Sequence, residues 1–381
     1  MVLLPDCGPH RGPWHRFYLA KRLKGRDLSD PKPAGNSNKP AGSSNKPAGS
    51  ADRPAGRPVI LSGMRPTGRL HWGNYTGALE NWVRLQDEYD CRFMVADWHV
   101  LTTALDKAGE INANSREMFL DWLGAGLDPE RSVLFLQSSI KEHAELFLVM
   151  SMMISMGRLQ RNPTFKEQVR DLNLGGEISF GHLGYPVLQA ADILAYRAHA
   201  VPVGEDQLPH LELTREMARR FNFLFGDVFP EPEALVTKFA RFPGTDGGRM
   251  SKSMGNTIEI SASPEEIRER IKPAFTDPAR LRRSDAGHPE VCSVYTWYQK
   301  FLPEALTQVA EECRTAARGC VDCKKQLAEG AIAHFAPLRE RRAEFEANPA
   351  RLDEIIAAGC DRARTLAQGT LARVHDAMGI G

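Results

Sequence analysis

The chain has 381 residues, with 49 Lys and Arg against 48 Asp and Glu and a formal net charge of +1 at pH 7. This balance excludes a uniformly basic or acidic protein, and the length allows a core that is stable without disulfides in two or three domains. No apolar run approaches the roughly 18 residues of a membrane span. The basic N-terminus lacks the apolar core of a signal peptide. We therefore expect a cytoplasmic protein whose seven cysteines are free thiols or metal ligands.

The positive charge is concentrated at the N-terminus. Residues 1–57 carry 11 Lys and Arg against four Asp, a formal charge of +7, which leaves −6 for the rest of the chain. A basic residue followed by Pro-Ala-Gly recurs there, starting at Lys32, Lys39, Lys46 and Arg53. Such a segment has too few apolar residues to offset its ordering entropy, so residues 1–57 are predicted to be a disordered extension. A dispensable linker and a weak nucleic-acid tether both remain open.

A glycine-rich turn follows at residues 61–75, Leu-Ser-Gly-Met-Arg-Pro-Thr-Gly-Arg-Leu-His-Trp-Gly-Asn-Tyr. An apolar run at 58–61 precedes it, and residues 76–86 carry apolar side chains at helical spacing. In open α/β sheets, ligands bind at such strand-to-helix turns, where helix N–H groups meet phosphates. Arg69 and Leu70 replace the Lys-Ser/Thr of a Walker A loop, and no G-x-G-x-x-G occurs, so neither common nucleotide fingerprint is present.

Strands and helices alternate after this turn. Strands are predicted at 91–96 and 132–137 with a helix at 113–123 between them, which is typical of a doubly wound parallel sheet. Asp97-Trp98-His99 comes directly after the first of these strands and should face the ligand crevice. The Met-rich stretch 146–156 is expected to be a buried or interface helix.

The next helix and strand carry polar residues in positions suited to a binding site. Tyr185, Gln189 and Asp192 recur at helical spacing and share one face of a helix. A carboxylate among apolar residues, as at Asp192, is costly unless it has a partner. A strand at 200–203 then ends in the polar turn 204–207, which could equally be a simple helix N-cap.

Beyond Ile260 the pattern is helical, with an N-cap signal at residues 263–266. Four cysteines in this part have the spacing C-x20-C-x6-C-x2-C, at Cys292, Cys313, Cys320 and Cys323. Four thiolates suit a [4Fe–4S] cluster or tetrahedral zinc, and unligated thiols are the alternative. Cys7, Cys91 and Cys360 fall outside the pattern and are expected to be single thiols.

Two motifs resemble the signatures of class I aminoacyl-tRNA synthetases. Pro-Thr-Gly at 66–68 with His-x-Gly-Asn at 71–74 is similar to the first signature as the tryptophan and tyrosine enzymes carry it. Gly-Gly-Arg-Met-Ser-Lys-Ser-Met-Gly-Asn at 247–256 is similar to their KMSKS loop. Val-Pro-Val-Gly-Glu-Asp-Gln at 201–207 looks like the tryptophan enzymes, whereas Gln189 matches the tyrosine pattern. A tyrosine–tRNA ligase, or a regulatory paralogue that binds an amino acid or a protein partner, remains open.

The resemblance implies an α/β fold with a Rossmann-like, doubly wound catalytic domain over residues 58–256. An all-α anticodon-binding domain would follow over 257–381. The implied reaction joins ATP and tryptophan to tryptophanyl-adenylate and then charges tRNA(Trp). ATP and Mg²⁺ are the implied cofactors, and a homodimer is the implied assembly. A subset of the bacterial tryptophan enzymes has a similar four-cysteine motif, which implies a [4Fe–4S] cluster.

The same resemblance assigns roles to individual residues. The implied catalytic residues are Thr67, His71, Asn74 and Lys252. The implied ATP site contains Arg65, Pro66, Thr67, Gly73, Asn74, Gly204, Glu205, Asp206, Phe242, Arg249, Met250, Ser251, Lys252 and Ser253. The implied tryptophan site contains Tyr185, Gln189, Asp192, Val201, Val203 and Gln207, with Asp192 accepting the indole N–H.

Overall fold

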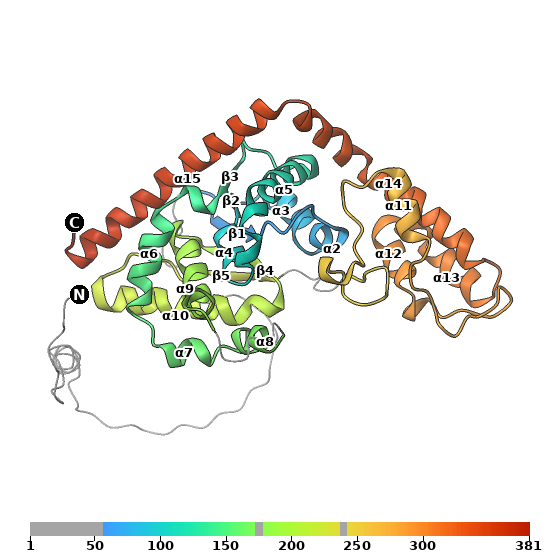
Figure 1. The fold of residues 1–381 in the computed structure, drawn as a ribbon, viewed down its shortest axis with the longest axis horizontal. Helices are drawn as coiled ribbons and strands as arrows, with labels where there is room; N and C mark the ends of the chain where they lie inside the picture. The colour runs from blue at the N-terminus through green and yellow to red at the C-terminus, as the bar shows by residue number, and fades with distance from the viewer. Residues whose placement is uncertain (1–55, 172–177, 237–241) are drawn as a thin grey trace, which may run out of the picture. The chain divides into compact units, whose positions relative to one another are not determined.

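The computed structural model describes residues 56–171, 178–236 and 242–381, and these belong to one compact unit. Nearly all of the predicted extension at 1–57 lies outside the described residues, so its disorder stays a prediction. Figure 1 gives the order of the elements along the chain.

The centre of the fold is a parallel five-stranded sheet in the order β3-β2-β1-β4-β5. The strands are β1 (Val59–Met64), β2 (Asp90–Val95), β3 (Ser132–Leu136), β4 (Ala200–Val203) and β5 (Glu233–Val236). The chain builds outward from β1 to β3 and then returns to place β4 on the other side of β1. The switch point, where open α/β sheets bind ligands, therefore lies between β1 and β4. The predicted doubly wound sheet is confirmed.

Helices surround the sheet and make up the C-terminal region. Those up to the last strand are α2 (Trp72–Asn74), α3 (Glu80–Leu85), α4 (Trp98–Leu101), α5 (Ile111–Ala125), α6 (Glu142–Ser151), α7 (Met156–Gln160), α8 (Pro163–Asp171), α9 (Phe180–Ala195) and α10 (Leu208–Phe225). Those after it are α11 (Pro264–Ile271), α12 (Ser293–Phe301), α13 (Leu306–Arg314), α14 (Cys320–Glu346) and α15 (Pro349–Met378). A π-helical turn at Tyr75–Leu79 joins α2 to α3. The Met-rich stretch 146–156 is not one helix, because α6 ends at Ser151 and Ser155 caps α7.

Both faces of the sheet are buried, as expected for parallel strands. Side chains alternate between two cores along each strand. Ile60, Phe93 and Leu134 pack on the face covered by α3, α5 and α14. Leu61 and Met94 pack on the opposite face, against α6, α9 and α10. The sheet is thus held between two packed layers of helices, and the turns that follow its strands are fixed at its C-terminal edge.

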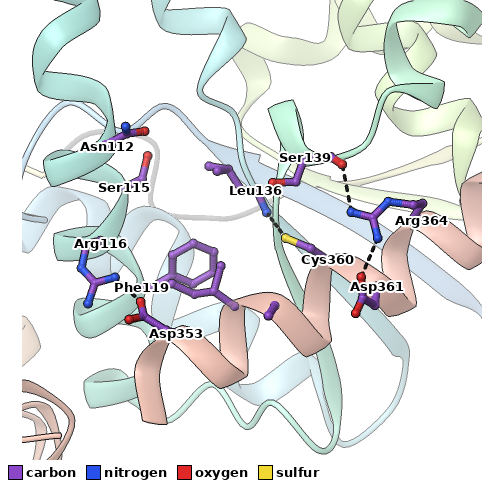
Figure 2. A pocket seen from close by; sticks show the side chains of 12 residues that line it. Asn112, Ser115, Arg116, Phe119, Leu136, Ser139, Asp353, Cys360, Asp361 and Arg364 are labelled. Atoms are coloured by element: carbon purple, nitrogen blue, oxygen red, sulfur yellow. Dashed lines mark hydrogen bonds and ion pairs between the residues drawn. The ribbon is translucent and has the colours of Figure 1, made fainter. Parts of the chain in front are cut away.

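Helix α15 covers the outer edge of β3 (Figures 1 and 2). Gly359 lies so close that a Cβ there would stand 1.8 Å from the Leu134 carbonyl oxygen. The Leu136 N–H donates to Cys360 Sγ at 3.5 Å, and Arg364 donates to the Ser139 carbonyl at 3.2 Å. An edge strand leaves backbone groups unpaired, and Cys360 of α15 provides a partner for one of them, the Leu136 N–H. A cavity of about 500 Å³ remains between α5, the end of β3 and α15.

The C-terminal helices pack directly on the turn that follows β1. The predicted N-cap is confirmed as a capping box between Ser263 and Glu266. Trp72 of α2 is fully buried and stacks on Phe335 of α14 with ring centroids 5.8 Å apart. Trp297 of α12 meets the same indole edge-on at 5.5 Å. The limits of the helical domain stay a prediction. Within the described ranges, no helix is long and apolar enough to span a membrane.

Candidate active site

Glycine is required at two positions here, one near the end of β1 and one in the turn that follows it. A Cβ on Gly63 would lie 2.8 Å from the Met94 carbonyl oxygen, so only glycine fits beside β2. Gly68 has φ +102°, a conformation that side chains rarely adopt. Arg65 in this turn donates to Thr103 Oγ1, and Pro66 is buried beside it.

His71 and Asn74 cap helix α2 reciprocally. The Asn74 N–H donates to His71 Nδ1 at 3.3 Å, and the His71 N–H donates to Asn74 Oδ1 at 3.1 Å. Because Nδ1 accepts a hydrogen bond, the proton of the neutral ring belongs on Nε2. The Nε2–H of His71 can therefore donate to a ligand. The side-chain amide N–H groups of Asn74 can donate as well, because only its Oδ1 is used in the cap.

The KMSKS-like loop contacts this turn. Lys252 Nζ donates to the Thr67 carbonyl at 2.9 Å and lies 3.5 Å from Thr67 Oγ1. The Gly73 N–H points at Met250 Sδ, 3.4 Å away, and a Cβ on Gly73 would touch both Met250 and the His71 ring. The two motifs, far apart in sequence, thus form one site.

The loop is held in shape by the buried Asn256. Its Oδ1 accepts from the Ser251 N–H at 2.7 Å, and its Nδ2 donates to the Arg249 carbonyl at 3.0 Å. Ser251 and Ser253 share a hydroxyl contact at 2.9 Å, while the Arg249 side chain is exposed. Burial, and then the positive charges of Lys252 and Arg249, lower the pKa of His71 to about 4. The imidazole is therefore neutral at pH 7.

A third group of predicted residues follows β4. Gly204, Glu205 and Asp206 form a short turn ahead of α10, with both carboxylates exposed. Gln207 donates to Asp206 Oδ2 at 3.0 Å. Since β4 lies next to β1 in the sheet, this turn and the one at 65–75 lie at the same edge. Phe242 is different, because its side chain is buried in the core and meets Phe301 edge-on.

Asp192 occupies the buried centre of the predicted tryptophan pocket. His99 Nε2 contacts its Oδ2 at 2.9 Å, and His143 Nδ1 contacts its Oδ1 at 2.5 Å. The Gln137 amide reaches both oxygens, at 2.9 and 2.8 Å. Burial alone would raise the pKa of Asp192, but charge interaction and hydrogen bonding with His143 and His99 lower it to about 2. Its roughly four lone-pair sites are all engaged, so an indole N–H would have to displace one donor.

The other predicted pocket residues lie around this centre. Tyr185, on the same helix α9, contacts His210 Nε2 through its hydroxyl at 2.9 Å, and burial raises its pKa. Gln189 is half-buried one helical turn before Asp192. Val201 is buried and Val203 half-buried on β4. Sequence reasoning placed His99 at the crevice but missed Gln137 and His143. Gln137 directly follows β3, so the rule that ligands bind at strand ends would have found it, whereas His143 gave no signal.

The four predicted ligand cysteines come together. Cys292, Cys313, Cys320 and Cys323 line one small cavity of about 30 Å³ beside Arg280. Arg280 donates to Cys313 Sγ at 3.8 Å and to Cys320 Sγ at 3.9 Å. Burial raises the pKa of Cys323 to about 11, and it raises the pKa values of Cys292 and Cys313 as well. Across the described residues, no group of three or more His, Cys, Asp or Glu side chains could hold a metal ion.

Comparison with known proteins agrees with this geometry. The family described as tRNA synthetases class I (W and Y) matches residues 53–336. The tryptophan–tRNA ligase of Thermotoga maritima is 50% identical, covering 84% of this chain and 99% of that protein. The tryptophan–tRNA ligase of Aquifex aeolicus is 42% identical, with coverage of 84% and 99%. The crystal structure of tryptophanyl-tRNA synthetase from Campylobacter jejuni, complexed with ADP and tryptophan, matches with a TM-score of 0.77 at 34% identity, covering 84% of this chain and all of that one.

Proposed function

Because this chain belongs to the class I tRNA synthetases of the W and Y family, we propose that it is a tryptophan–tRNA ligase. It activates tryptophan with ATP to tryptophanyl-adenylate and then transfers the aminoacyl group to tRNA(Trp), in the cytoplasm. The observation that carries the proposal is the contact of Lys252 with Thr67, since it joins the two halves of the nucleotide site.

Activation needs donors at the phosphate that the tryptophan carboxylate attacks. The Nε2–H of His71, the Asn74 amide and the Thr67 hydroxyl provide them within one turn, and donors fixed in advance stabilise the charge that develops. Lys252 follows the β- and γ-phosphates as pyrophosphate leaves. Mg²⁺ bound with ATP would neutralise part of the charge on the phosphates. No side chain needs to form a covalent intermediate, because positioning and charge supply the rate.

The nucleotide lies between the turns after β1 and β4. Gly73 leaves room for the adenine ring beside Met250, and the exposed Glu205 and Asp206 hold the ribose with Gly204. Arg65, Pro66, Arg249, Ser251 and Ser253 complete this site. Phe242 takes part through its backbone, since its carbonyl accepts the Met250 N–H at 3.1 Å while its ring is buried.

Tryptophan lies against β4 and α9. Val201 and Val203 line the indole slot, and Tyr185, Gln189 and Gln207 surround the amino acid. Asp192 accepts the indole N–H when the Gln137 amide, which spans both of its oxygens, gives up one of them. This exchange keeps the carboxylate fully hydrogen-bonded, as a buried charge requires.

The four cysteines hold a [4Fe–4S] cluster in this proposal. The four thiols around one cavity would supply the donor set that such a cluster needs. The cluster would tie α12, α13 and the start of α14 together and so support a basic surface for the anticodon.

The protein acts as a homodimer in this proposal. Leu148, Met152 and Met156 are 54, 73 and 62% exposed along α6 and the start of α7. Large apolar side chains exposed at such closely spaced positions of the chain are typical of an interface. Size-exclusion chromatography with light scattering should give twice the mass of the chain.

Pyrophosphate exchange with each of the amino acids tests the proposed activity. Tryptophan alone should support exchange, and the protein should charge tRNA(Trp). Exchange with tyrosine instead would establish the rival that Gln189 suggests. Absence of exchange with every amino acid would leave the regulatory paralogue.

A further inference from the structure

The backbone around His71 is fixed from three sides. The Leu70 N–H donates to Asp121 Oδ2 at 2.6 Å. The Leu70 carbonyl accepts from the Ile260 N–H at 2.9 Å, and the Trp72 N–H donates to the Ile258 carbonyl at 2.9 Å. Two of these bonds come from the strand-like segment after the KMSKS-like loop, and one comes from a side chain of α5. Together these bonds fix the backbone on both sides of His71 and therefore the position from which its ring extends.

The Asp121 carboxylate depends on a partner from the C-terminal helices. Asp121 is fully buried, and burial raises its pKa to about 6 despite the opposing charge of Arg342. Arg342 of α14 is 3% exposed and pairs with Asp121 Oδ1 at 2.5 Å. Removing Arg342 would leave the buried Asp121 carboxylate without its charge partner, which is costly, so the position of Asp121 depends on Arg342.

Arg342 is itself held rigidly. Its Nη2 pairs with Glu117 at 2.5 Å and with Glu346 at 3.0 Å. A Cβ on Gly124 would lie 2.9 Å from Arg342 Cβ, so α5 and α14 touch at this point without room for a side chain between them. A shift of α14 along α5 would therefore move Arg342, and with it the carboxylate that holds Leu70.

We propose that Asp121 and Arg342 are positioning residues for tryptophan activation. Asp121 accepts the Leu70 N–H and so orients the His71 ring toward the reacting phosphate. Through Arg342, the position of the ring is coupled to α14, in the region expected to bind tRNA. The inference rests on the proposed function. Trp72, packed between Phe335 and Trp297, is a second contact between the same two parts.

Three substitutions test the pair by tryptophan-dependent pyrophosphate exchange. Asp121→Ala should lower kcat by ~10- to 100-fold with the KM for tryptophan within about twofold, since a small misplacement of a reacting group has effects of this size. Asp121→Asn should recover part of the loss, because its amide oxygen still accepts the Leu70 N–H. Arg342→Lys should fall between them, since one ammonium cannot reach Asp121, Glu117 and Glu346 together.

Asp353→Asn is the matched control. The ion pair between Arg116 and Asp353 also joins α5 to a C-terminal helix but does not touch the His71 segment, so its loss should leave kcat and KM unchanged. Thermal unfolding of each variant shows whether the protein assayed is folded. If Asp121→Ala does not fold, Asp121→Asn and Arg342→Lys test the inference without it. Normal exchange in these variants overturns the inference, and so does a parallel loss of kcat and tryptophan binding. Absence of exchange in the wild type would instead overturn the proposed function.

Discussion

The ammonium group of Lys252 lies 2.9 Å from the Thr67 carbonyl oxygen, although 185 positions separate the two residues in the chain. Thr67 belongs to the turn after β1, which ends at the His71 cap of α2. A phosphate bound at this turn would meet Lys252 on one side and His71 with Asn74 on the other. The loop therefore completes the site, and Lys252 is the residue whose removal tests it most directly.

Lys252→Ala should reduce kcat of pyrophosphate exchange by ~10²- to 10³-fold, with little change in tryptophan affinity. The lysine acts on charge that develops as pyrophosphate leaves, so its loss affects the transition state more than the bound substrate. Initial-rate exchange assays measure kcat, and separate tryptophan titrations measure the affinity. Lys272→Ala, which removes an exposed lysine, is the charge-matched control. A kcat within about twofold of wild type would show that Lys252 has another role.

His71 should remain neutral from pH 8 down to about pH 5. Burial lowers its pKa to about 4, against about 6.5 in the unfolded chain. Between these values the unfolded chain binds the extra proton, so the contribution of His71 to stability falls as the pH falls from 6.5 towards 4. NMR titration of the imidazole measures the pKa directly. Lys252→Ala should raise it, because one of the positive charges that lower it is gone, whereas a midpoint near 6.5 in the wild type would contradict the buried cap.

Most of the fold could be predicted because its signals are local. The apolar strands at β1, β2 and β3, the helical period of α5 and the cap at Ser263 are each written in a few consecutive residues. The prediction of one helix over the Met-rich stretch was wrong. The apolar residues continue through 152–154, between the end of α6 and the Ser155 cap of α7, so the periodicity gave no sign of the break. The cover that α15 gives to β3 could not be predicted either, since it depends on tertiary packing.

The site was predictable only where motifs name the residues. His71, Asn74 and Lys252 stand in two recognisable patterns, and Asp192 stands out as a carboxylate in an apolar helix. By contrast, no sequence pattern indicates that His143 contacts Asp192 or that Arg342 pairs with Asp121. Arg342 lies 221 positions from Asp121, and it is one of four consecutive charged residues at 339–342 on a long helix, where charged side chains are ordinarily solvated. Such pairs follow from the packing of helices and cannot be read from spacing.

Asp192→Ala should destabilise the fold as well as tryptophan recognition. The resemblance implies only a role for Asp192 in recognition, but the structure shows a buried carboxylate that satisfies His99, Gln137 and His143. Breaking such a network costs about 3–5 kcal/mol of unfolding free energy, which urea titration measures. Because the pKa of Asp192 is lowered to about 2, its contribution is complete above pH 4 to 5 and is lost as the pH falls towards 2.

Gln189→Ala, on the half-buried face of the same helix, is the control for Asp192 and should cost far less stability. A tryptophan analogue without the indole N–H tests recognition separately in the wild type. It should be a poor substrate, because without the N–H its ring forms no hydrogen bond to Asp192 that would fix it in the pocket. Full exchange with that analogue would show that Asp192 is a structural residue only.

Removal of residues 1–55 should leave pyrophosphate exchange intact, because every predicted site residue lies after residue 56. The cut should spare Arg57, whose side chain donates to the Gln86 carbonyl at 3.2 Å. Any loss should appear as weaker tRNA affinity at low salt, as expected for a basic tether. Exchange kinetics and filter binding at two salt concentrations separate these effects, and a truncated protein without exchange would contradict the prediction.

Cys320→Ser should remove a bound cluster and impair tRNA charging while sparing pyrophosphate exchange. Cys320 begins α14 and lines the cavity with Cys292, Cys313 and Cys323, whereas the proposed exchange residues lie in other elements. Anaerobically purified wild type should be brown, absorb near ~400 nm and contain about four irons per chain, because four thiolates hold one [4Fe–4S] cluster. Cys360→Ser is the control, since that thiol accepts from Leu136 on β3 and should leave iron and charging unchanged. Colourless wild-type protein that lacks iron and zinc, and that still charges tRNA at full rate, would show that these four cysteines are free thiols.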